Sequence, residues 1–194
     1  MKNPYITDRP LTDQDLFFGR EAQFKQLVAF LNAGQSLFLL YGRRSIGKTS
    51  FLNQLSLRLG ARYMVRRIAW PPPTNKATDL LWAAMEGVSQ ALGQAAPDPQ
   101  KYATEPEGYA LDYLRSLAAH TTGKAVLICF DALPVAAFAA GGGGQEALVR
   151  LRAALKDADG LAVLLAIEGS PTDTDLGVAF ADLPQITLGP LQPE

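Results

Sequence analysis

Residues 42–49 of this 194-residue chain read GRRSIGKT and match the pattern G-x-x-x-x-G-K-[S/T]. An apolar run, residues 36–41, precedes the pattern, and residues 48–59 repeat apolar side chains at helical spacing after it. A chance match in such a chain has odds on the order of one percent, judged from ordinary residue usage. In this context the pattern predicts a buried strand, a tight loop and a helix, the start of a parallel α/β sheet.

The residue types of this loop suit phosphate binding. Glycines let successive N–H groups turn toward one anion, and the following helix directs its positive end toward the same point. We expect Lys48 to act on the β- and γ-phosphates of a nucleotide as a catalytic residue, and the Thr49 hydroxyl to ligate Mg²⁺. The predicted nucleotide-binding residues of the loop are Gly42, Arg43, Arg44, Ser45, Ile46, Gly47, Lys48, Thr49 and Ser50.

A carboxylate for the metal follows another apolar run. Residues 126–130 predict a buried strand that ends at Asp131. An Asp after a strand is by itself more often a turn or cap residue. Because a phosphate loop lies upstream, we assign Asp131 to Mg²⁺ together with Thr49.

The rest of the chain alternates predicted strands and helices, which favours an α/β fold with helices on both faces of a mostly parallel sheet. Three arginines lie on or beside residues 63–68 and predict a charged edge strand there. Residues 93–106 are expected to form a proline-containing loop. The remaining predicted strands are 161–167 and 185–188, and the remaining predicted helices are 21–33, 77–92, 109–120 and 146–156.

Composition excludes several classes of protein. One cysteine and one histidine exclude a disulfide framework and a Cys/His zinc cluster within the chain. The longest aliphatic run, residues 161–167, is too short to span a membrane, so we expect a cytoplasmic protein without membrane contact. The net charge is −1, with 11 of the 18 basic residues in residues 1–75, which agrees with an anionic ligand bound early in the chain.

Three segments resemble the STAND branch of the AAA+-related P-loop ATPases, and archaeal and origin-recognition ATPases are similar. The segments are LFFGRE (16–21), LFLLYGRRSIGKTSFLNQL (37–55) and the terminal LGPLQPE (188–194). The resemblance implies a three-layer P-loop sandwich with a five-stranded sheet of order 5-1-4-3-2. It also implies that Phe18 and Arg20 help to enclose the nucleotide. The alternatives are that Phe18 anchors the first helix in the core and that Arg20 forms a structural salt bridge.

The resemblance further implies a nucleotide-dependent switch that binds ATP or ADP with Mg²⁺. The ATPase core would span residues 16–188, after an extended segment 1–15. Residues 189–194 would lead to a lid and winged-helix module, and other domains or self-association beyond residue 194 would supply the partners.

Hydrolysis is the weak point of this resemblance. Asp131 corresponds to the metal-binding Walker B aspartate of these families, and many relatives carry a second acid directly after it. That position is Ala132 here, and a methyl group accepts no proton. Glu168, after the predicted strand 161–167, is the candidate substitute, and Ser170 is the candidate sensor. The alternative for Glu168 is a solvated residue at the end of a strand. We therefore expect slow or partner-dependent hydrolysis.

Other functions remain as alternatives. A non-hydrolysing nucleotide-binding scaffold would explain Ala132. A DNA-transaction helper ATPase is the third interpretation, but nucleic acid is not the favoured partner, because no aromatic residues interleave the arginines near residues 62–67. ATP is favoured over GTP because the Asn-Lys-x-Asp element of Ras-type GTPases is missing. A P-loop small-molecule kinase is disfavoured because residues 132–145 contain no arginine for a basic lid.

Overall fold

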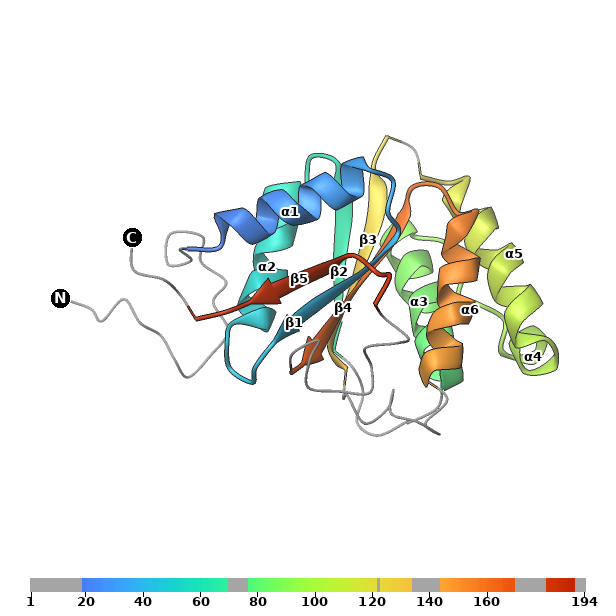
Figure 1. The fold of residues 1–194 in the computed structure, drawn as a ribbon. Helices are drawn as coiled ribbons and strands as arrows, with labels where there is room; N and C mark the ends of the chain where they lie inside the picture. The colour runs from blue at the N-terminus through green and yellow to red at the C-terminus, as the bar shows by residue number, and fades with distance from the viewer. Residues whose placement is uncertain (1–18, 70–76, 122, 134–143, 170–180, 191–194) are drawn as a thin grey trace.

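The computed structural model describes residues 19–69, 77–121, 123–133, 144–169 and 181–190, and Figure 1 shows their arrangement. Five parallel strands form one sheet in the order β2-β3-β4-β1-β5, so the predicted order 5-1-4-3-2 is confirmed. The strands are β1 (Leu37–Gly42), β2 (Tyr63–Ala69), β3 (Ala125–Leu133), β4 (Leu161–Glu168) and β5 (Gln185–Leu188). The helices are α1 (Glu21–Asn32), α2 (Lys48–Leu59), α3 (Ala77–Leu92), α4 (Pro99–Thr104), α5 (Pro106–Ala118) and α6 (Gly144–Lys156).

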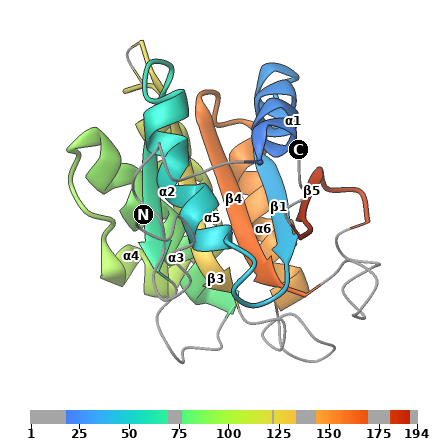
Figure 2. The ribbon, with the colours of Figure 1, turned by 90° about the vertical axis from the view of Figure 1, so that its left-hand side faces the viewer.

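Helices cover both faces of the sheet, as Figures 1 and 2 show. Alternate residues of β1 point to opposite sides: Phe38 and Leu40 pack with α1 and α2, whereas Leu39 and Tyr41 pack with α3, α5 and α6. Every residue of β1 is buried, which explains why this strand reads as one continuous apolar run.

Strand order determines which residues lie together at the candidate site. The chain leaves β1 through α2, reaches the edge at β2, and returns through β3 and β4, so that β4 lies between β1 and β3. Because the strands are parallel, the segments that follow β1, β3 and β4 all emerge at one edge of the sheet. Ligands of open α/β sheets bind at this carboxyl edge.

Two expectations need correction, and a third is confirmed. The loop expected at 93–106 contains the short helix α4, whose N-cap Asp98 accepts hydrogen bonds from the backbone N–H groups of Gln100 and Lys101. Pro99 occupies the first helical turn, where its missing N–H costs nothing. Strand β3 continues past Asp131 to Leu133. Strand β2 pairs with β3 alone among the described strands and exposes Arg66 and Arg67, as expected of a charged edge strand.

None of the helices in the described residues is both long and apolar enough to cross a membrane.

Candidate functional site

The loop between β1 and α2 is tightly closed. A Cβ at Gly42 would lie 2.6 Å from Cγ2 of Ile46, so only glycine fits without a shift of the loop. Gly47 caps α2 with φ +100°, a conformation that L side chains rarely adopt. Ser45 also has a positive φ, 61°. The chain therefore curls around the start of α2, as the sequence pattern predicts.

The start of α2 offers donors to an anion. The first helical hydrogen bond joins the Phe51 N–H to the Gly47 carbonyl, so the N–H groups of the preceding turn have no acceptor within the helix. Lys48 lies beside them with 7% of its surface exposed, and its Nζ donates to the carbonyl oxygens of Gly42 (2.7 Å) and Arg43 (2.9 Å). An ammonium group has three donors, so one remains for a phosphate oxygen.

Two carboxylates act on the pKa of the Lys48 ammonium group. Burial lowers the pKa of Lys48 below its ordinary value, and the charges of Glu168 and then Asp131 act in the opposite direction. Glu168 is the register partner of Gly42, and the Gly169 N–H donates to the Gly42 carbonyl at 3.1 Å. The exposed residue Glu168 thus lies beside the phosphate loop.

Asp131 is buried and paired. One of its carboxylate oxygens accepts a hydrogen bond from Nη1 of Arg67 at 2.9 Å, and 7% of its side chain is exposed. Arg67 was not predicted as a site residue: the sequence suggested a charge on an edge strand or, less favoured, a nucleic-acid contact. Its pairing with Asp131 depends on the register between β2 and β3, which the sequence does not show.

The oxygen donors present are those that Mg²⁺ prefers in a phosphate loop. The Thr49 hydroxyl belongs to the first turn of α2. The Asp131 carboxylate lies close enough to Lys48, the residue before Thr49, to act on the pKa of its ammonium group. The described residues contain no group of three or more His, Cys, Asp or Glu side chains arranged to hold a metal by themselves. This donor set fits a metal that takes its remaining ligands from nucleotide phosphates and water.

Arg20 contacts the backbone of the phosphate loop. Its guanidinium donates from Nη1 to the Gly189 carbonyl (2.8 Å) and from Nη2 to the Ile46 carbonyl (3.1 Å), and 4% of the residue is exposed. Burial lowers the pKa of this guanidinium from its ordinary value. Both acceptors are backbone carbonyls, so Arg20 links the phosphate loop to the segment after β5.

Comparison with solved structures adds the fold family. No protein-family model matches the sequence, and no curated protein matches it. A chain of Drosophila ORC bound to DNA superposes with a TM-score of 0.53 and 16% identity, covering 89% of this chain and 90% of that one. The Walker-type ATPase of Pyrococcus abyssi gives 0.55 and 18% over 93% of this chain, and the Aeropyrum pernix Orc1 protein in complex with DNA gives 0.57 and 18% over 98%.

The chain has an α/β P-loop NTPase-like fold, which it shares with these ATPases. It spans 56% of the Pyrococcus chain and 50% of the Aeropyrum chain, and 90% of the Drosophila chain. At identities of 16–18% the likeness concerns the fold, so site assignments rest on the residues of this chain.

The remaining predicted site residues differ in their exposure to solvent. Arg43, Arg44 and Ser45 are exposed on the loop, and Ser50 is buried at the start of α2. Ala132 is exposed next to Asp131. Phe18 and Ser170 lie outside the described residues, as do segments 1–15 and 191–194.

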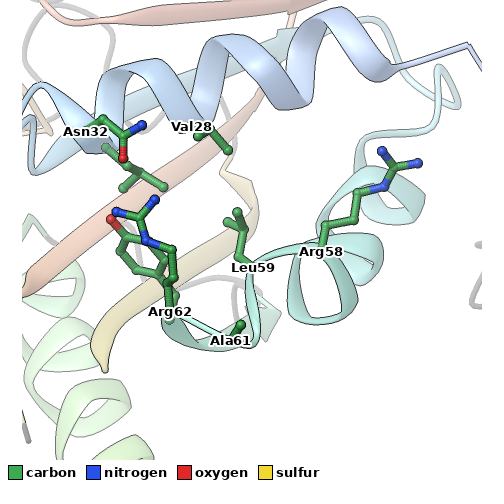
Figure 3. Close-up of a pocket in the computed structure, with 8 residues that line it drawn as sticks. Val28, Asn32, Arg58, Leu59, Ala61 and Arg62 are labelled. Carbon is green, nitrogen blue, oxygen red and sulfur yellow. The ribbon is translucent and has the colours of Figure 1, made fainter. Parts of the chain in front are cut away.

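A cavity of about 240 Å³ lies at the opposite end of α2 from the phosphate loop. Leu59 ends α2 there, and Val28, Asn32, Arg58 and Arg62 are among the residues around the cavity in Figure 3. Tyr63, the first residue of β2, also lines it, so the cavity belongs to the amino end of the strands. It is separate from the carboxyl edge that carries Lys48, Asp131 and Glu168.

Proposed function

We propose that this chain is the Mg²⁺-ATP-binding core of a P-loop ATPase that acts as a nucleotide-dependent regulatory switch. The observation that carries the proposal is the environment of Lys48. This ammonium group is buried at the N-terminus of α2, held by the loop's own carbonyls, and influenced by two nearby carboxylates. A charged amine kept in so costly a position is expected where it has an anionic ligand to bind.

In this proposal each residue has a separate task. Lys48 and the N–H groups at the start of α2 bind the phosphates, and Arg43 and Arg44 add positive charge at the rim of the loop. Thr49 and Asp131 would hold Mg²⁺, which neutralises phosphate charge when bound. Arg20 would act on the nucleotide through the loop that it supports. Phe18 remains a proposed contact to the adenine, and Ser170 a proposed sensor.

Hydrolysis would depend on Glu168. Its carboxylate is at the loop edge of β4 and exposed, so it is available to orient or deprotonate a water. Ala132 cannot supply this function, and turnover would therefore be slow or partner-dependent. The same observation favours the second candidate function, a nucleotide-binding scaffold without hydrolysis.

The readout of the switch would come from other domains or from self-association, in the cytoplasm. The Drosophila and Aeropyrum neighbours are described as bound to DNA, which keeps a DNA-transaction ATPase as a further candidate. ATP-stimulated DNA binding that weakens as salt is raised would favour that candidate.

The test of nucleotide binding is thermal unfolding with Mg²⁺-ATP, Mg²⁺-ADP and Mg²⁺-GTP. A ligand at 100 times its Kd stabilises the folded chain by about 2.7 kcal/mol, which raises Tm by several degrees. We expect this shift with adenine nucleotides and its loss in Lys48→Ala. Lys156→Ala, an exposed lysine at the end of α6, is the matched control. The absence of a shift with every nucleotide would contradict the proposal.

A further inference from the structure

The ion pair between Arg67 and Asp131 differs from the other ion pairs of the described residues. In those, the carboxylate side chain is 52–65% exposed, whereas that of Asp131 is 7% exposed. Exposed pairs contribute little, because water already solvates both charges. A buried carboxylate needs a positive partner, since an unpaired charge there is strongly unfavourable. Arg67 supplies that charge at the carboxylate assigned to the metal.

Sheet geometry directs Arg67 toward the phosphate loop side. Arg67 is the register partner of Cys129, so it shares a sheet face with Cys129 and Asp131, two residues later on β3. Cys129 packs in the core formed with α1 and α2, which identifies this face as the one covered by α2. The neighbouring Arg66 has the opposite parity and donates to Gln90 of α3. Only one of the two adjacent arginines therefore reaches the site.

We propose that Arg67 is the counter-cation of Asp131 in the metal-free protein, and that Mg²⁺ must displace it or share the carboxylate with it. This inference rests on the proposed function and concerns its regulation. The guanidinium of Arg67 already contacts Oδ2 of the carboxylate that Mg²⁺ would use, so this ion pair would raise the Mg²⁺ concentration that the site requires. The side chain of Arg67 is 39% exposed on an edge strand, which leaves it a path into solvent when metal enters.

The inference predicts two opposite effects of one substitution. In Arg67→Gln, Asp131 loses its competitor, so the Mg²⁺ concentration for half-maximal binding of the β,γ-imido analogue of ATP should fall about three- to tenfold. In EDTA the same variant should bind the analogue more weakly, because Asp131 then faces the phosphates without a compensating charge. A residue that merely supported the fold would move both affinities in the same direction.

The experiment is a calorimetric titration of the full chain with the ATP analogue at a series of Mg²⁺ concentrations and in EDTA. Arg66→Gln is the matched control, since it removes the same charge one residue away on the other face. In an Asp131→Asn background, Arg67→Gln should no longer change the Mg²⁺ requirement. Arg67→Lys keeps the charge and serves if the glutamine variant does not fold. It should retain most of the wild-type Mg²⁺ requirement.

The outcomes separate the two proposals. If the wild-type chain binds no nucleotide, the proposed function is wrong and the role of Arg67 falls with it. If the wild-type chain binds nucleotide but Arg67→Gln leaves the Mg²⁺ requirement unchanged or raises it, the competition is refuted and the nucleotide site stands. A change of equal size in Arg66→Gln would also refute the competition, because it would reflect general charge.

Discussion

The guanidinium of Arg20 donates a hydrogen bond to the carbonyl oxygen of Ile46 in the middle of the phosphate loop, 3.1 Å away. A second bond from the same group reaches the Gly189 carbonyl just after β5. One buried side chain before α1 thus joins the loop to the end of the sheet's edge strand. Through these bonds Arg20 supports the backbone that would bind phosphate.

Removal of Arg20 should therefore harm both stability and ligand binding. In Arg20→Ala the two carbonyls lose their donors, and we expect the free energy of unfolding to fall by about 1–3 kcal/mol. Arg20→Lys should recover only part of this, because an ammonium group lacks the planar fork that spans two acceptors. Urea denaturation measures the loss. Arg115→Ala, which removes an exposed arginine paired with Asp157, should change stability little, and equal losses in both variants would contradict the assignment.

Gly42→Ala tests the closure of the loop. The added Cβ would lie 2.6 Å from Ile46 and 3.3 Å from the Cβ of Leu188, so the loop or the end of β5 must shift. We expect a destabilisation of about 1–3 kcal/mol and loss of the nucleotide-dependent rise in Tm. At Gly189 an added Cβ meets no atom within 4 Å, so Gly189→Ala is the control and should retain both properties. Full nucleotide binding by Gly42→Ala would show that loop closure is not required.

Glu168→Gln separates hydrolysis from binding. The amide keeps the size of the side chain but cannot accept a proton, so steady-state phosphate release should fall by a factor of about 10²–10⁴. Nucleotide binding should be nearly unchanged, because Glu168 is not expected to touch the phosphates. Glu86→Gln, on the exposed side of α3, is the control. Unchanged turnover in Glu168→Gln would leave Glu168 as a solvated strand-end residue.

Cys129 should report global unfolding. It is fully buried in the middle of β3, and burial, with a smaller contribution from Asp131, raises the pKa of its thiol above the ordinary value of 9.0. Thiol reagents should therefore react only as fast as the chain unfolds, and reactivity at native-state rates would contradict this burial. The unfolded state ionises first, so the contribution of Cys129 to stability is present below pH 9 and declines as the pH rises above it. Comparison with Cys129→Ala in alkaline urea titrations isolates this decline.

The local parts of the site could be predicted from neighbouring residues in the chain. Glycine at positions 42 and 47, followed by a helical repeat from Lys48, specifies a loop and a helix start through interactions among neighbours in the chain. The continuous apolar strands indicated a sheet covered on both faces, and the family resemblance added the strand order. The short helix α4 was missed because the prolines favoured a loop, although Asp98-Pro99 is a helix-start signal.

Contacts between residues far apart in the chain could not be predicted in this way. Arg67 and Asp131 are 64 residues apart, and Arg20 and Gly189 are 169 apart, so no local pattern connects them. The contact between Arg67 and Asp131 depends on the register of β2 with β3, in which a slip of one residue would turn the side chain of Arg67 to the other face of the sheet. Burial then selects the partners, because a charged group removed from water must find a donor or acceptor that the folded chain brings within reach.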